Sequence, residues 1–152
     1  MSNENLNKND PTGSLECALL YFEAGNFKLD NGNPDEAIVE YREAIQVWSG
    51  DARFYNNLGI AYRQQGEMEA AEQNLARAIE LDSRYRDAYS NLGLVLLDRE
   101  LYEEAVANFT VAIEIDPRFW YAYSGRGLAL WALGKKDEAL FEYAKLRSLE
   151  QV

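Results

Sequence analysis

Residues 55–78, which read YNNLGIAYRQQGEMEAAEQNLARA, contain one copy of a pattern that recurs along the chain. Gly59 in this stretch belongs to a series of glycines spaced 34 residues apart, and Ala71 belongs to a series of alanines with the same spacing. The two series are Gly25, Gly59, Gly93, Gly127 and Ala37, Ala71, Ala105, Ala139. A fixed period of this length indicates a supersecondary unit that repeats and stacks on its neighbours. Stacked repeats form extended surfaces, which favours a binding module over a catalyst.

The period divides the chain into four units, which are residues 18–51, 52–85, 86–119 and 120–152. Each unit has two apolar helical patterns separated by a turn near its fifteenth position, at Gly32, Gly66, Glu100 and Gly134. The sequence therefore predicts an all-α fold, an α-solenoid of about eight helices in antiparallel pairs. The repeat domain is expected to cover residues 14–152, and the polar residues 1–13 are expected to form a disordered tail.

Small and large residues occupy fixed positions within the units. The eighth position is always glycine and the twentieth is always alanine, whereas the twenty-fourth is always bulky: Tyr41, Leu75, Phe109, Tyr143. The fourth position is always tyrosine: Tyr21, Tyr55, Tyr89, Tyr123. Small residues facing large ones at constant spacing predict an interdigitated helix pair, and the strict repetition indicates structural roles for these tyrosines.

The composition excludes several classes of function. The 152 residues carry a formal net charge of -11 and no basic tract, which argues against nucleic acid and anionic membrane surfaces as partners. The chain has no histidine and a single cysteine, Cys17, so an internal disulfide is impossible and the commonest general base is missing. No phosphate-binding glycine loop occurs. We therefore expect no enzyme activity, no cofactor and no metal site. No segment resembles a signal peptide or a membrane span, so we expect a cytoplasmic location and no membrane insertion.

The repeated residues resemble the tetratricopeptide repeat (TPR), whose pattern is aromatic-x2-Leu-Gly-x2-Tyr followed by Ala-x3-Phe, Ala and Pro. Unit 2 matches with Tyr55, Leu58, Gly59, Tyr62, Ala71, Leu75 and Ala78, and unit 3 with Tyr89, Leu92, Gly93, Ala105, Phe109, Ala112 and Pro117. Unit 1 departs at Ala24 and Lys28, and unit 4 departs at Arg126 and Leu146. The resemblance covers residues 18–152 and implies a right-handed superhelix that binds proteins.

By this resemblance the first helix of each unit lines a concave groove that holds a peptide or helix of a partner protein. The groove residues so implied are Phe22, Asn26, Arg53, Asn56, Asn57, Ile60, Arg63, Asn91, Leu94, Tyr121, Leu128 and Trp131. Asn57 and Asn91 either bond the backbone of a bound peptide, as asparagine does at this position in some TPR groups, or are only common TPR residues. Phe22, Tyr121 and Trp131 are either exposed binding hot spots or partly buried core residues.

One specific partner class can be tested from residue types. Some TPR domains clamp the C-terminal carboxylate of cytosolic heat-shock chaperones with lysines, arginine and asparagines spread over three units. The corresponding places in units 1 to 3 hold Phe22, Asn26, Asn57, Asp87 and Asn91. The corresponding places in units 2 to 4 hold Asn56, Ile60, Asn91, Tyr121 and Gly125. Neither set supplies the cations that a carboxylate requires, so we do not expect this clamp.

The C-terminal end of the array offers a second candidate surface. Units 1 to 3 carry Ile45, Ile79 and Ile113 at the twenty-eighth position, whereas unit 4 carries Arg147, as a solvent-facing end requires. Leu140, Leu146 and Leu149 nevertheless lie on or near the same face, which suggests partner docking or a weak homo-oligomer through the last helix. Three functions therefore stay open: a groove that binds a partner protein, a scaffold that self-assembles through the array ends, and a regulatory subunit of an enzyme complex.

Overall fold

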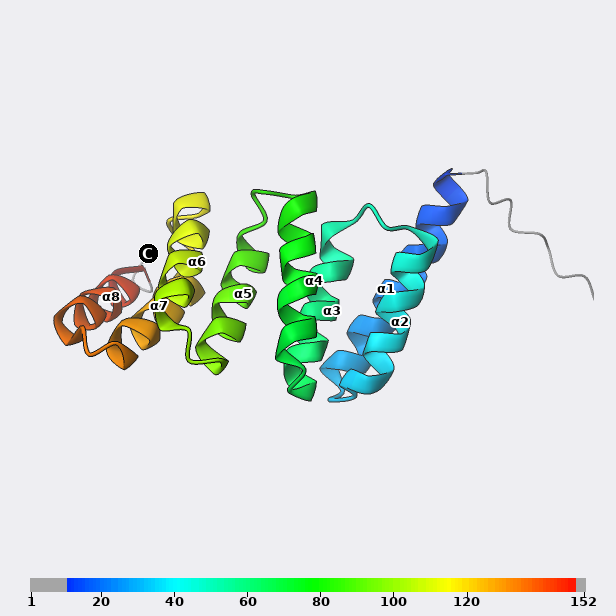
Figure 1. The fold of residues 1–152 in the computed structure, drawn as a ribbon. Coiled ribbons are helices and arrows are strands. Elements are labelled where there is room, and N and C mark those ends of the chain that lie inside the picture. Colours follow the sequence, from blue (N-terminus) through cyan, green and yellow to red (C-terminus); the bar gives the residue numbers. More distant parts are fainter. Residues whose placement is uncertain (1–10, 150–152) are drawn as a thin grey trace, which may run out of the picture.

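The computed structural model describes residues 11–149, with side chains from 14 to 147, and this part of the chain forms eight helices and no strand. The helices are α1 (Pro11–Asp30), α2 (Pro34–Val47), α3 (Ala52–Gln65), α4 (Met68–Leu81), α5 (Arg86–Asp98), α6 (Tyr102–Ile115), α7 (Trp120–Ala132) and α8 (Lys136–Leu149). They stand side by side as four antiparallel pairs in chain order (Figure 1). The predicted α-solenoid is confirmed.

The N-terminal boundary differs from the expectation. Helix α1 begins at Pro11, inside the segment 1–13 that we predicted as a tail. Proline is well suited to the first turn of a helix, because its missing N–H would have no intrahelical acceptor there. Residues 1–10, which make up the rest of the predicted tail, lie outside the described residues.

Left-handed backbone conformations end the first helix of every unit. Gly32, Gly66 and Gly134 have φ values of 76°, 84° and 77°, and Glu100 takes the same place in unit 3 with φ 61°. Glycine adopts this conformation without the steric cost that a Cβ brings. These four residues are the turn positions that the period predicts.

Close contact between the two helices of a unit explains the paired small and bulky positions. A Cβ placed on Gly59 would lie 2.7 Å from Cγ of Leu75, and one placed on Gly93 would lie 2.8 Å from the ring of Phe109. Leu75 and Phe109 are themselves fully buried. Glycine is therefore required where the bulky side chain of the second helix meets the backbone of the first.

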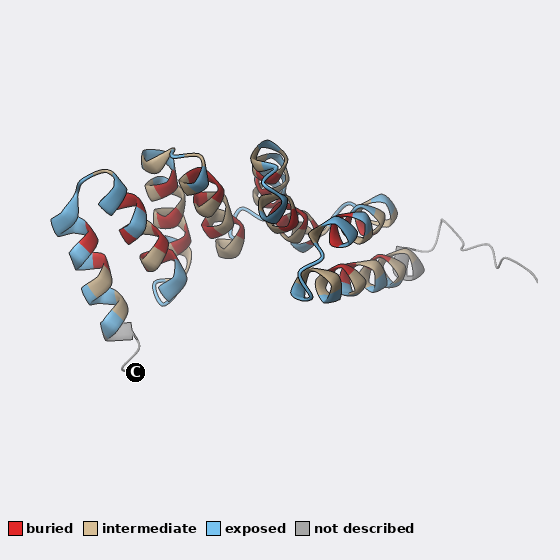
Figure 2. Ribbon diagram, turned by 90° about the horizontal axis from the view of Figure 1, so that it is seen from below, coloured by how far each residue is buried: buried red, intermediate tan, exposed pale blue. Residues whose placement is uncertain are grey.

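The two helices of a unit have different neighbours. The first helices α1, α3, α5 and α7 contact one another across successive units, whereas no contact joins the second helices within the described part of the chain. The first helices therefore lie on the tighter, inner side of the curved array. Buried residues face the seams between helices, and exposed residues cover the outer surfaces (Figure 2). None of these helices is long and apolar enough to cross a membrane.

Candidate functional site

Residues at equivalent positions in the first helices of successive units form two parallel rows on the inner side of the array. The fifth and sixth positions supply an amide row, made of Asn56, Asn57 and Asn91. Asn26, at the ninth position of the first unit, extends this row onto α1. The ninth position supplies an aliphatic row of half-buried Ile60, half-buried Leu94 and exposed Leu128. The rows arise because each unit repeats the orientation of the preceding one, so residues 34 positions apart lie next to each other along the groove.

The amide row is a continuous chain of hydrogen bonds across three helices. Asn91 donates through Nδ2 to Oδ1 of Asn56 (2.9 Å), and Asn56 donates to Oδ1 of Asn57 (2.9 Å). Asn57 donates in turn to Oδ1 of Asn26 (2.8 Å), which also accepts from the hydroxyl of Tyr41 (2.9 Å). Burial raises the pKa of Tyr41 to about 12, so its hydroxyl keeps the proton that it donates.

The two ends of this chain have hydrogen-bonding capacity left. Nδ2 of Asn26 donates to no described residue, and Oδ1 of Asn91 accepts from none. A primary amide has two donor hydrogens and two acceptor lone pairs, so the asparagines can bond a ligand while they hold one another. An unused donor at one end and an unused acceptor at the other match the N–H and C=O groups of a peptide backbone.

Two adjoining hollows flank the amide row. One, of about 400 Å³, is lined by Asn26, Leu29, Asp30, Tyr41, Asn57, Ile60 and Gln64. The other, of about 370 Å³, is lined by Asn56, Asn57, Ile60, Tyr85, Asp87, Ser90, Asn91, Phe119 and Tyr121. Asn57 and Ile60 belong to both, so the hollows meet at α3 and form one groove. The Oγ of Ser90 in the second hollow is buried and has no hydrogen-bond partner among the described residues.

Both groove arginines are engaged by carboxylates of this chain. Arg63 donates through Nε to Asp98 (2.6 Å), which bridges α3 and α5. Arg53 forms a fork with both oxygens of Asp51, and its guanidinium lies over the ring of Phe22. Arg53 lines a separate hollow of about 480 Å³ at the loops between units, together with Trp48 and Tyr85. The inner surface therefore offers neutral amides to a ligand and few free cations.

The structure separates the three aromatic candidates. Phe22 is only 6% exposed and packs against Phe54 and Tyr41, with ring centroids 4.9 and 5.8 Å apart, so it belongs to the core and does not line the groove. Tyr121 and Trp131 are exposed on α7 together with Leu128. They form an apolar ledge where the groove reaches the last unit, and Nζ of Lys136 lies 5.6 Å from the Trp131 ring centroid.

The candidate end surface is only partly exposed. Leu140 is 57% exposed, whereas Leu146 is half-buried. The side chain of Leu149 lies outside the described residues. Leu146 occupies the position that Ala44, Ala78 and Ala112 take in the other units, where the side chain is completely buried.

Sequence reasoning missed three groove residues, Tyr41, Tyr85 and Phe119. Tyr41 is a core residue of a second helix whose hydroxyl reaches across to Asn26, and the pattern indicated only its bulk. Tyr85 and Phe119 precede α5 and α7. They stand 34 residues apart at the last position of units 2 and 3, and this pair of aromatic residues was a signal that the groove positions taken from the resemblance left out, because those lie within the helices. Burial, and secondarily the charge of Asp87, raises the pKa of Tyr85 to about 12.

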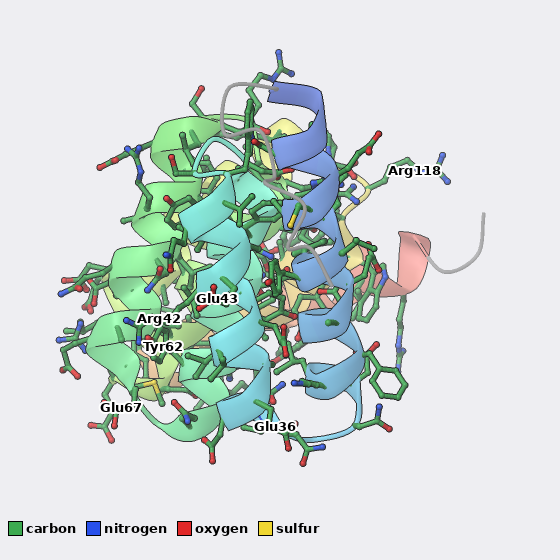
Figure 3. All side chains as sticks on the ribbon, turned by 90° about the vertical axis from the view of Figure 1, so that its right-hand side faces the viewer. Glu36, Arg42, Glu43, Tyr62, Glu67 and Arg118 are labelled. Carbon is green, nitrogen blue, oxygen red and sulfur yellow. The ribbon has the colours of Figure 1, made fainter. Side chains whose placement is uncertain are left out.

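A fourth hollow lies on the outer side of the array. It has a volume of about 620 Å³, and its lining includes Arg42, Glu43 and Tyr62 where α2 meets α3 and α4 (Figure 3). Among the described residues, the side chains that line it form no chain of hydrogen bonds comparable to the amide row. No cluster of potential metal ligands occurs among the residues that the structure describes.

Comparison with known proteins identifies the repeats. One sequence model of the tetratricopeptide repeat matches residues 15–84 and 51–118, and another matches residues 90–147. No curated protein sequence matches the chain. Among solved structures, the crystal structure of MamA is 32% identical over 88% of this chain and 78% of that chain, with a TM-score of 0.81.

Two other solved structures show the same arrangement of helices. The first TPR domain of Spaghetti (RPAP3), bound to the HSP90 peptide SRMEEVD, is 26% identical over 78% of this chain and 94% of that chain, with a TM-score of 0.75. The Arabidopsis OM64 TPR domain is 25% identical over 76% of this chain and 96% of that chain, with a TM-score of 0.74. With family matches that together span most of its length, the chain belongs to the tetratricopeptide repeat family.

Proposed function

We propose that this protein is a non-catalytic interaction module that holds an extended segment of a partner protein along its inner groove. The observation that carries the proposal is the hydrogen-bonded asparagine chain from Asn91 to Asn26, with hollows on both sides and unused hydrogen-bonding groups at its ends. Amides that orient one another form a rigid row of donors and acceptors, so a bound backbone need not order them. The structure of the related RPAP3 domain with a bound peptide supports this use of the fold.

The two rows indicate the chemistry of the partner segment. An extended backbone against the amide row would direct side chains toward Ile60, Leu94 and Leu128 of the aliphatic row. Adjacent helices lie about 10 Å apart and an extended chain rises about 3.3 Å per residue, so one unit spans about three residues of the partner. The fitting segment is extended in the polyproline II conformation, in which residues three apart point the same way, and it carries an apolar side chain about every third residue.

The charge of the groove argues for a partner other than an acidic C-terminus. Arg53 and Arg63 are already paired with Asp51 and Asp98, and Asp30 and Asp87 line the two hollows. A carboxylate-rich peptide would meet acidic groups with no free cation at the amide row. A neutral or basic segment fits better, and binding to a basic segment would weaken as the salt concentration rises.

A peptide-display selection on the intact protein tests the proposal. A library of linear peptides is selected against the wild type, and the peptides obtained are measured against Asn57→Ala/Asn91→Ala by fluorescence anisotropy. We expect affinity to fall roughly tenfold or more, because at least two hydrogen bonds to the ligand are lost. The matched control Asn74→Ala/Asn108→Ala removes two asparagines of α4 and α6 whose side chains, among the described residues, bond only their own helices, and it should bind normally.

Two outcomes contradict the proposal. One is the recovery of no peptide that binds specifically. The other is a set of peptides that bind the groove variant and the control variant equally well, which would place their site elsewhere.

A further inference from the structure

The outer face of α1 is apolar and uncovered. The third and tenth positions of a unit are completely buried in α3, α5 and α7, because there the first helix packs on the second helix of the preceding unit. The buried residues at these positions are Phe54, Ala61, Ala88, Val95, Ala122 and Ala129. In α1 the same positions hold Leu20 and Phe27, which are 73% and 71% exposed. Figure 3 looks onto this end of the array, where no described helix lies in front of α1 and α2.

The opposite end of the array has the complementary face uncovered. Ile38 of α2 is buried where α3 packs on it, whereas its counterpart Leu140 in α8 is exposed. Ile45 is partly buried against the same cluster, and its counterpart Arg147 is exposed. The face of α8 that corresponds to the α3-binding face of α2 is therefore open in the described part of the chain. We call Leu20, Ala24 and Phe27 the N-terminal end face, and Leu140, Ala144 and Arg147 the C-terminal end face.

The two end faces lie in regions of opposite charge. Unit 1 has seven acidic and two basic residues, whereas unit 4 has four acidic and five basic residues. Glu16, Glu23 and Asp30 are exposed on α1, whereas the exposed charges of α8 are three basic residues and two acidic ones, Lys136, Lys145, Arg147, Asp137 and Glu138. Opposite charges favour contact between the two different ends, and contact between two N-terminal ends would place acidic units against each other.

We propose that the N-terminal end face of one copy packs on the C-terminal end face of a second copy, so that α1 lies on α8 as α3 lies on α2. Such a contact joins two different surfaces and leaves one of each unoccupied at the ends of the pair. Copies therefore add head to tail into open chains that continue the solenoid. A contact of about one helix pair is small, so the association depends steeply on concentration. The proposal concerns the array ends and stands apart from the inner groove.

Sedimentation velocity of the full chain at low salt, up to about millimolar concentration, tests this association. One variant, Leu20→Glu/Phe27→Glu, blocks the N-terminal end face, and another, Leu140→Glu/Ala144→Glu, blocks the C-terminal end face. We expect the wild type to form a concentration-dependent series of species, and each variant alone to be monomeric, with its association constant reduced about tenfold or more. An equimolar mixture of the two should form dimers that do not grow, because each variant retains the face that the other lacks.

The control is Phe141→Glu, which changes a side chain of α8 that is 67% exposed and lies outside the end face. Its counterpart Val39 stays exposed although α3 packs on α2, so this position is not covered by a following unit. Phe141→Glu should associate like the wild type, and circular dichroism should show full helix content for all variants because every altered position is solvent-accessible.

Three results would overturn the proposal. A wild type that stays monomeric at every concentration removes it directly. A blocked variant that still dimerises by itself shows a symmetric contact or a different face. A mixture of the two variants that stays monomeric shows that the two end faces do not recognise each other.

Discussion

At the scale of single residues, the strictly repeated positions are explained by contacts that leave no free space. Gly93 approaches the ring of Phe109, and a Cβ placed on Gly125 of α7 would also meet that ring. Phe109 is thus enclosed by the backbones of α5 and α7 and is fully buried. The glycine of the repeat pattern is a consequence of the bulky residue that it faces.

The substitution Gly93→Ala should lower the free energy of unfolding. Alanine favours the helix by about 1 kcal/mol, but the new methyl group would overlap a ring that cannot move, which costs about 1–3 kcal/mol. We expect a net loss of about 1 kcal/mol in urea denaturation followed by circular dichroism. The double variant Gly93→Ala/Phe109→Leu provides the control, because the smaller side chain makes room and the two effects should not add. Simple additivity would contradict the overlap.

Where unit 4 departs from the pattern, the structure shows compensation. Arg126 occupies a position that is leucine in units 2 and 3, and its guanidinium donates to both oxygens of Glu142 (2.9 Å each) and to Oγ1 of Thr110 (3.1 Å). Glu142 is buried, and Nε of Arg126 is buried without a hydrogen-bond partner in the described part of the chain. A buried ion pair thus replaces an apolar contact in the last unit, and the removal of either charge alone would leave the other unpaired.

At the scale of elements, the turn between α5 and α6 is the strained one. Glu100 adopts φ 61°, whereas the equivalent turns use Gly32, Gly66 and Gly134. Its backbone N–H still donates to the carbonyl of Leu97 (3.0 Å), so the helix end is formed in the same way. The exposed side chain of Glu100 forms no ion pair with a described residue, and nothing in the structure explains why glycine is absent here.

The substitution Glu100→Gly should stabilise the protein. A residue with a Cβ in the left-handed conformation costs about 1–2 kcal/mol, and this cost disappears with glycine. Part of the stabilisation is offset, because glycine loses more conformational entropy on folding than glutamate does. We expect the free energy of unfolding to rise by about 0.5–1 kcal/mol in urea denaturation. The reverse change, Gly66→Ala, should lower it by a similar amount, and a destabilised Glu100→Gly variant would show that the turn is not strained.

At the scale of the whole molecule, each unit is stabilised from outside only by contacts with the adjacent units in the described part of the chain. Helix contacts join a unit to the next one along the array and to no other among the described residues. The inner units 2 and 3 have a neighbour on each side, whereas units 1 and 4 have one. Stability in such an array is close to a sum of the units and the contacts between them, so the ends open more readily than the middle.

Hydrogen exchange should therefore report a gradient along the chain. At low protein concentration, amides of α4 and α5 should exchange slowest and amides of α1 and α8 fastest, as measured by mass spectrometry. Raising the concentration should protect α1 and α8 selectively if copies add end to end. Uniform protection of all eight helices would show that the array opens as a single unit.

Much of this architecture follows from the sequence, because a 34-residue period corresponds to one helix–turn–helix unit that stacks on its neighbours. The turns at Gly32, Gly66, Glu100 and Gly134, and the contact of Gly59 with Leu75, were predictable from spacing and residue size. The sequence could not show that Phe22 lies in the core and not in the groove, because this depends on how Phe54 of the following unit packs against it. The early start of α1 at Pro11 was also missed, because the repeat pattern begins only at Ala18.

The 34-residue period is enough to predict that four units stack into a solenoid, since the same small and bulky residues recur at positions that only an interdigitated helix pair requires. How the variable residues combine depends on the packing of one unit on the next. This packing joins Asn91, Asn56, Asn57 and Asn26 into one hydrogen-bonded chain, and it leaves Leu20 and Phe27 uncovered at the end of the array. These features depend on the relative orientation of successive units, because a hydrogen bond between residues of different units and the covering of a helix by its neighbour are properties of the stack.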